Sequence, residues 1–116
     1  MVSMLKKPWG YEELLEYNKN YSLKKLFMKA DNCCSLQYHN FKHETIYVLS
    51  GKLKIITKLS KIDNSIIENI LAEGNYMVIE PGLVHRMCGI TDCIYLEAST
   101  SQLDDVVRLE DDYGRV

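Results

Sequence analysis

Short runs of strand-forming residues follow one another along the chain, and turn residues separate them. The clearest run is Thr45–Ser50 (TIYVLS), which is rich in β-branched and aromatic residues and is followed at once by Gly51. Short strands at this spacing are typical of an all-β sandwich or barrel. The expected strands are Leu23–Lys29, Ser35–His39, Thr45–Ser50, Lys52–Leu59, Ile66–Leu71, Tyr76–Glu80, Leu83–Cys88 and Cys93–Ser99.

The two ends of the chain are less regular than its middle. Residues 1–20 are expected to form an N-terminal arm or strand, although Glu12–Tyr17 (EELLEY) is compatible with a helical turn on propensity alone. The acidic tail, residues 102–116, is expected as a short helix or as an extended arm laid on the barrel. A chain of 116 residues supports one core of modest size, so we expect a single domain over residues 1–116.

Charge and hydropathy argue against two classes of partner. The formal net charge is -2, and no basic stretch is present that would bind nucleic acid. No apolar run approaches the ~20 residues that a membrane-spanning helix needs. Residues 1–8 contain no long apolar segment and no small-residue cleavage site, so a secretory signal is not expected. We therefore expect a cytoplasmic protein that binds neither nucleic acid nor a membrane.

The four cysteines, Cys33, Cys34, Cys88 and Cys93, form no CxxC pair. In a reducing compartment such residues are most simply free thiols that pack as small apolar groups. The alternative that stays open is a redox pair between Cys88 and Cys93 across a hairpin.

Three polar side chains share one face of neighbouring segments. Gln37 and His39 are two residues apart in an expected strand, so both leave the same face. Glu44 comes five residues later, and a turn or bulge around residues 40–42 is needed to return it to that face. Glu44 then belongs to the same alternating set as the apolar residues of the next strand, which point inward. His43 is out of phase with Glu44 and should point outward.

A fourth polar residue, His85, follows the Pro81-Gly82 turn and shares a face with Met87. A carboxylate and imidazoles on the inward face of a small barrel are costly to bury without compensation. One divalent cation would compensate all of them, and nitrogen and oxygen donors suit zinc first, with manganese, iron, cobalt or nickel as alternatives. The other interpretation is a hydrogen-bonded polar mouth without metal. The predicted metal ligands are Gln37, His39, Glu44 and His85.

These same residues resemble known motifs. Gln37-x-His39, followed by Glu44 and Gly51, resembles the first cupin motif with Gln in place of its first His, and Gly74 through Pro81-Gly82-x-x-His85 resembles the second. More narrowly, the chain resembles the C-terminal cupin domain of bacterial bifunctional mannose-6-phosphate isomerase/GDP-mannose pyrophosphorylases. The matching segments are residues 7–11 (KPWGY), 35–39 (SLQYH), 48–51 (VLSG), 81–86 (PGLVHR) and 104–115 (DDVVRLEDDYGR).

The resemblance implies a cupin fold, a double-stranded β-helix or jelly-roll barrel, in a homodimer that isomerises phosphosugars. It places the family's metal ligands on the four residues reached from spacing, and a phosphosugar-binding arginine on Arg115. The chain departs from the family where Lys42-His43 replaces Arg-Ala before the metal Glu. The family's nucleotidyltransferase domain has no counterpart in these 116 residues, so we expect no GDP-mannose synthesis from them.

In the isomerisation of mannose 6-phosphate to fructose 6-phosphate, a metal could act as a Lewis acid and a nearby base would carry the proton. The phosphate would need cationic partners. Lys24 lies on the apolar face of its strand and matches a lysine of the family, so it is a candidate catalytic group. Glu97 is another candidate. Arg115, by resemblance, is placed among both the catalytic and the substrate-binding candidates, with Arg108 and Arg86 as further binders. For Arg86 the alternative to substrate binding is an ion pair with an acid on the outer face, because it is out of phase with His85.

Two other functions stay open. A two-His-one-carboxylate set (His39, Glu44, His85) is compatible with a non-haem iron dioxygenase. The second alternative is a non-catalytic, metal-bearing sugar-binding module that partners a separate sugar nucleotidyltransferase.

Overall fold

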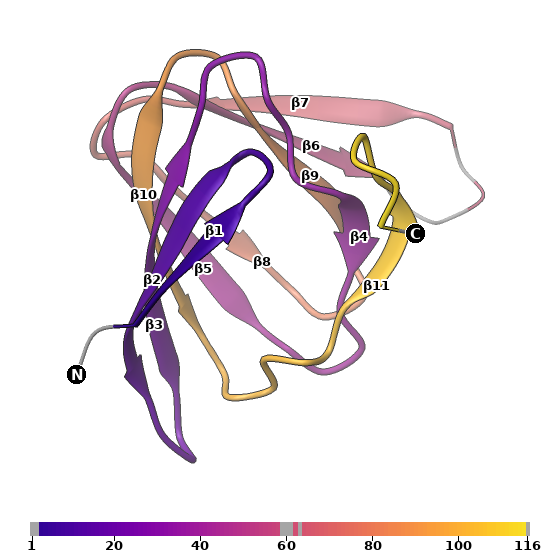
Figure 1. Cartoon of the computed structure of the whole chain (residues 1–116). Coiled ribbons are helices and arrows are strands. Elements are labelled where there is room, and N and C mark those ends of the chain that lie inside the picture. Colours follow the sequence, from indigo (N-terminus) through magenta and orange to yellow (C-terminus); the bar gives the residue numbers. More distant parts are fainter. Residues whose placement is uncertain (1–2, 59–61, 63, 116) are drawn as a thin grey trace.

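Two antiparallel β-sheets face one another in the computed structural model, which describes residues 3–58, 62 and 64–115 (Figure 1). The six-stranded sheet has the order β1 (Ser3–Lys7), β2 (Gly10–Tyr17), β3 (Ser22–Met28), β10 (Cys93–Ser99), β5 (Glu44–Ser50) and β8 (Tyr76–Ile79). The five-stranded sheet has the order β11 (Val107–Glu110), β4 (Leu36–Tyr38), β9 (Val84–Gly89), β6 (Leu53–Lys58) and β7 (Ile66–Leu71). From β7 to β11 the chain passes from one sheet to the other at every connection. The expected all-β fold is confirmed.

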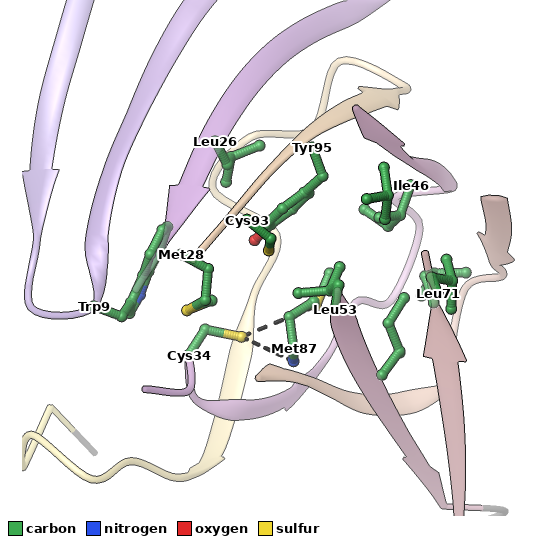
Figure 2. Packing of buried hydrophobic residues seen from close by; sticks show 13 residues of the cluster. Trp9, Leu26, Met28, Cys34, Ile46, Leu53, Leu71, Met87, Cys93 and Tyr95 are labelled. Carbon is green, nitrogen blue, oxygen red and sulfur yellow. Dashed lines mark hydrogen bonds between the residues drawn. The ribbon is translucent and has the colours of Figure 1, made fainter. Parts of the chain in front are cut away.

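Alternation of apolar and polar side chains explains this arrangement. In β6, Leu53 and Ile55 are fully buried while the residues between them are partly exposed, and Ile46 and Val48 behave in the same way in β5. The buried faces of the two sheets meet in one core, where Trp9 and Leu26 from one sheet pack with Met87 and Leu53 from the other (Figure 2). The strand pattern read from the sequence therefore already identifies the buried face.

Gly51 joins the two sheets where β5 ends. Its φ of 79° lies in the left-handed region, and a Cβ at this position would collide with the backbone of Asp92. The glycine thus permits the tight passage from β5 to β6 that the sequence indicated.

A strand lies near each end of the chain, β1 at the N-terminal side and β11 at the C-terminal side. The helical turn considered for Glu12–Tyr17 is wrong, because this segment is β2 and pairs on both sides, with β1 and β3. Stacking of Tyr11 on Phe27, with ring centroids 5.4 Å apart, adds to this pairing, so cross-strand contacts outweigh local helix propensity. In the tail, the extended arm is confirmed: β11 pairs with β4 at the end of the five-stranded sheet (yellow in Figure 1). Residues 1–2 of the expected N-terminal arm, Leu59 at the end of an expected strand and Val116 of the tail lie outside the described residues.

The expectation of four free thiols is wrong for two of the cysteines. Cys33 and Cys88 form a disulfide, because an antiparallel bridge brings them opposite each other with Cα atoms 4.1 Å apart. Cys34 and Cys93 are buried free thiols, as expected. The alternative Cys88–Cys93 pair does not form, since the two residues lie in different sheets. The described residues contain no helix long and apolar enough to cross a membrane.

The disulfide should contribute measurably to stability, because it closes a loop between residues separated by 55 positions. Reduction, or the double substitution Cys33→Ala/Cys88→Ala, is expected to lower the free energy of unfolding by about 2–4 kcal/mol. Urea titrations with and without reductant measure this. The double variant is the control and should not respond to reductant; an equal midpoint for the oxidised and reduced wild type would contradict the prediction.

Candidate metal centre and cavity

Three potential metal ligands converge between the two sheets. His39 follows β4, Glu44 opens β5, and His85 lies in β9, so both sheets contribute. One ligand atom from each residue lies within 4.8 Å of the others, and all three side chains are buried. The Glu44 Oε1 atom is 3.3 Å from the Nε2 atom of each imidazole. His43 is exposed, in agreement with its phase.

The second nitrogen of each imidazole fixes which atom faces the centre. The His39 Nδ1 atom is 2.6 Å from the Asp105 carbonyl oxygen, and the His85 Nδ1 atom is 2.9 Å from the Leu83 carbonyl oxygen. A carbonyl only accepts hydrogen bonds, so each Nδ1 carries the proton and each neutral Nε2 presents a lone pair. This is the arrangement that metal-ligating histidines adopt.

The atoms that face the centre have no hydrogen-bond partner among the residues that the structure describes. They are both Nε2 atoms and the Oε1 atom of Glu44, all buried. Buried polar atoms are nearly always paired, and three acceptors facing one another repel unless a cation lies between them. The donor set therefore fits a divalent metal ion, with two imidazole nitrogens and one carboxylate oxygen as borderline ligands.

The electrostatics of Glu44 keep it ionised. Burial raises the pKa of this carboxyl group, whereas the positive charge of Lys42 beside it lowers the pKa. The Lys42 Nζ atom is 3.3 Å from the Glu44 Oε2 atom. Glu44 thus presents a charged oxygen to the centre at neutral pH.

A second carboxyl group, Glu97, lies behind Lys42. The Lys42 Nζ atom is also 3.3 Å from the Glu97 Oε2 atom, and both side chains are almost fully buried. Burial and the charge of Glu44 raise the pKa of Glu97 to about 7, against the opposing charges of Lys42 and Lys24. For Lys42, burial lowers the pKa but the two carboxylates raise it above its usual value. One ammonium group therefore links the candidate metal ligand Glu44 to Glu97, whose pKa is raised to about 7.

Gln37, the fourth predicted ligand, is directly opposite His85 in the pairing of β4 with β9. Directly opposite residues share a face, so its side chain points into the barrel. Its Oε1 atom accepts a hydrogen bond of 2.6 Å from the Ser35 hydroxyl group. Its assignment as a metal ligand stays a prediction.

A cavity of about 370 Å³ opens beside these residues. Gln37, His39, Lys42 and Glu97 contribute to its wall, which also includes residues of β1, β2 and the tail. Lys24 contributes as well, on the strand directly opposite Glu97, with its Nζ atom 3.5 Å from the Glu12 carboxylate. The structure thus brings the candidate catalytic residues Lys24 and Glu97 to one face of the sheet.

The three candidate arginines have different surroundings. Arg115 lines the cavity and makes a two-pronged ion pair with Asp111, with both distances 2.8 Å. Arg86 does not line the cavity: it donates to the Cys34 carbonyl oxygen and to Asp112, as its phase suggested. Arg108 lines the cavity from β11.

Two residues of the site were missed by the sequence analysis. Lys42 was assigned to a turn, although it precedes Glu44 by two positions and so shares its inward face. Asp105 accepts hydrogen bonds from the backbone N–H groups of Asn40, Phe41 and Lys42 at 3.0, 2.6 and 2.9 Å, and its carbonyl orients His39. No pattern in the sequence signals this, because Asp105 lies more than sixty residues away in the chain.

Comparison with known families agrees with this geometry. The family described as "Mannose-6-phosphate isomerase C-terminal" matches residues 2–111. The chain belongs to this family. Among curated proteins, it is 27% identical over 114 residues to the xanthan biosynthesis protein XanB of Xanthomonas campestris pv. campestris (strain B100), covering 94% of this chain and 23% of that protein. It is 28% identical over 120 residues to mannose-1-phosphate guanylyltransferase of Escherichia coli (strain K12), covering 95% and 23%.

Solved structures show the same fold at low identity. The capsular polysaccharide assembling protein CapF of Staphylococcus aureus superposes with a TM-score of 0.82 at 20% identity, covering 95% of this chain and 34% of that one. Oxalate decarboxylase of Bacillus subtilis gives 0.75 at 16% identity, covering 90% and 29%. Both are cupins, so the fold of this family member is a cupin jelly-roll barrel, as expected. It spans about a quarter of the length of the curated relatives that it matches.

Removing an imidazole should empty the metal centre. For His39→Ala we expect loss of the single divalent ion. Removal of a residue that only hydrogen-bonds to a metal ligand lowers the affinity for the metal roughly 10–100-fold, and removal of the ligand itself should lower it further. The matched control is His43→Ala, which removes an exposed imidazole four positions away. Metal analysis of both purified variants decides the matter, and stoichiometric metal in His39→Ala would refute the ligand assignment.

Loss of the Asp105 carboxylate should loosen the segment between His39 and Glu44. Because the carboxylate accepts three backbone hydrogen bonds there, Asp105→Ala is expected to cost about 1–3 kcal/mol of stability and to weaken metal binding up to about 10-fold. Asp104→Ala, which removes an exposed neighbouring carboxylate, is the control. Thermal unfolding and metal titration provide the two measurements; identical behaviour of both variants would contradict this role of Asp105.

Proposed function

We propose that this chain is a metal-dependent phosphosugar isomerase that interconverts mannose 6-phosphate and fructose 6-phosphate. The observation that carries the proposal is the placement of Glu97 and Lys42 between a buried His–Glu–His set and a cavity lined by cationic side chains. Membership of the mannose-6-phosphate isomerase C-terminal family supports the substrate class.

The reaction moves a proton between carbons 2 and 1 of the sugar through an enediolate. A divalent ion held by His39, Glu44 and His85 would act as a Lewis acid on the substrate oxygens. Glu97 would take the proton from carbon 2 of the aldose and return it to carbon 1. The hydroxyl proton moves from oxygen 2 to oxygen 1 in the same interconversion, which completes the ketose. Proton transfer by a positioned group of this kind contributes roughly 10²–10⁴-fold.

The neighbours of Glu97 would control that proton transfer. Lys42 contacts the carboxylates of Glu97 and Glu44 at 3.3 Å each, so it holds the proton carrier next to the metal ligand. Lys24 lies directly opposite Glu97 in the sheet and adds positive charge on the substrate side. Arg115 would close the cavity from the tail, with its guanidinium group oriented by Asp111.

A coupled assay tests the proposal. With mannose 6-phosphate and each of zinc, manganese, iron, cobalt and nickel in turn, we expect turnover that a chelator abolishes and the effective metal restores. Glu97→Gln keeps the shape of the side chain and should lower kcat by at least about 10²-fold. The matched control, Glu73→Gln, changes an exposed carboxylate and should retain activity. Absence of turnover with every metal would refute the isomerase.

Two alternatives have specific support. The curated relatives include a mannose-1-phosphate guanylyltransferase, which supports a sugar-binding module that works with a separate nucleotidyltransferase. Binding of mannose 6-phosphate without turnover would favour that module. The two-His-one-carboxylate set favours a non-haem iron dioxygenase; oxygen consumption with bound iron would favour that enzyme.

The homodimer and the cytoplasmic location stay predictions. Sedimentation of the purified protein measures its oligomeric state.

A further inference from the structure

The cavity beside the metal centre is lined by more cationic than anionic side chains. The cations are Lys7, Lys24, Lys42, Arg108 and Arg115, and the anions are Glu12, Glu97 and Asp104. A wall of this composition favours an anionic ligand. The anion is expected to contact a cation that has no carboxylate partner of its own.

Four of the five cations have carboxylate partners. Lys7 and Lys24 share the Glu12 carboxylate, at 3.9 and 3.5 Å. Lys42 lies between its two carboxylates. The guanidinium fork of Arg115 is occupied by Asp111, whose pKa this contact lowers to about 2.

Arg108 differs from these four residues. Its Nε atom is buried and has no hydrogen-bond partner among the described residues. None of the ion pairs within residues 3–58, 62 and 64–115 includes Arg108, although its charge contributes weakly to the low pKa of Asp111. Guanidinium N–H groups are strong donors, so a buried one without a partner needs an explanation.

The sheet pairing aims Arg108 at the metal centre. Arg108 on β11 is directly opposite Gln37 on β4, and Gln37 is directly opposite His85 on β9. The three residues form one cross-strand row, and residues of such a row project from the same face. At a strand spacing of about 4.8 Å, the backbones of Arg108 and His85 are roughly 10 Å apart. The row therefore presents a cation at one end and a metal ligand at the other.

This spacing matches a ligand with two different ends. In a hexose 6-phosphate, the oxygens on carbons 1 and 2 lie at one end and the phosphate lies at the other. A planar guanidinium fork matches phosphate oxygens in a two-pronged contact. We propose that Arg108 is the phosphate anchor of this cavity, and that it selects sugar phosphates over neutral sugars; the inference rests on the proposed function for the identity of the sugar.

Binding measurements on the metal-loaded full chain test this assignment. Calorimetric titrations with mannose 6-phosphate, mannose and inorganic phosphate compare wild type, Arg108→Met and Arg108→Lys. We expect the wild type to bind mannose 6-phosphate more tightly than mannose. Arg108→Met should weaken mannose 6-phosphate binding roughly 10–100-fold, the usual loss for a charged hydrogen-bonded contact, and leave mannose binding unchanged. Arg108→Lys should fall between the two, because it keeps the charge and loses the fork.

Two controls separate anchoring from a general effect. Lys52→Ala removes one exposed positive charge outside the cavity and should bind all three probes like the wild type. Arg115→Lys should weaken binding less than Arg108→Lys, since Asp111 already occupies Arg115. Metal content and thermal unfolding of each variant report its folding; if Arg108→Met does not fold, the comparison of Arg108→Lys with Arg115→Lys decides.

The outcomes also distinguish this inference from the proposed function. Arg108-dependent binding of mannose 6-phosphate or inorganic phosphate without turnover would support the anchor and refute the isomerase. Unchanged mannose 6-phosphate affinity in Arg108→Met, or equal losses for mannose and mannose 6-phosphate, would overturn the anchor while leaving the isomerase intact. Failure of the wild type to bind any of the three probes would also overturn it.

Discussion

The mutual approach of the Glu44 carboxylate and two imidazoles inside the barrel is the interaction on which the rest of the structure depends. Each of the three atoms that meet there is an acceptor, and the described part of the chain supplies none of them with a hydrogen-bond donor. Such a group of lone pairs is unfavourable in a dry interior unless a cation balances it. The backbone carbonyls on the far side of both rings show that the arrangement is held in place by the surrounding chain.

The centre also couples the two sheets. Glu44 begins β5 of the six-stranded sheet, whereas His85 lies in β9 of the five-stranded sheet. His39 leaves the end of β4, a strand of three residues that has a single Cα pair with β9. This short strand is held by two further connections: the Cys33–Cys88 disulfide just before it, and the tail, where β11 and Asp105 contact it from the other side.

The buried ion cluster next to the centre explains how a small barrel tolerates so many charges. Lys42 is shared by two carboxylates, one of which faces the metal centre while the other faces the cavity. A buried lysine with a single partner is costly, and this one has two. The cluster that permits burial of Glu44 also places Glu97, a carboxyl group of raised pKa, against the cavity wall.

Much of this could be read from residue spacing. Strand alternation located the inward faces of β5 and β6, and a period of two placed His39 and Glu44 inside and His43 outside. Local propensity failed at Glu12–Tyr17, where strands on both sides determine the structure. Spacing also placed Lys24 on the apolar face of its strand, but only the structure shows that it lies directly opposite Glu97.

What the sequence by itself determined is the two-residue period of its strands, because side-chain direction in a strand follows from covalent geometry alone. That period was enough for the all-β fold and for the inward set of polar residues. The tertiary structure alone decided which distant segments meet: Cys33 with Cys88, Asp105 with residues 40–42, and Arg108 with Gln37. Those contacts depend on the order of strands across two sheets, which results from the packing of the whole core and leaves no local pattern in the chain.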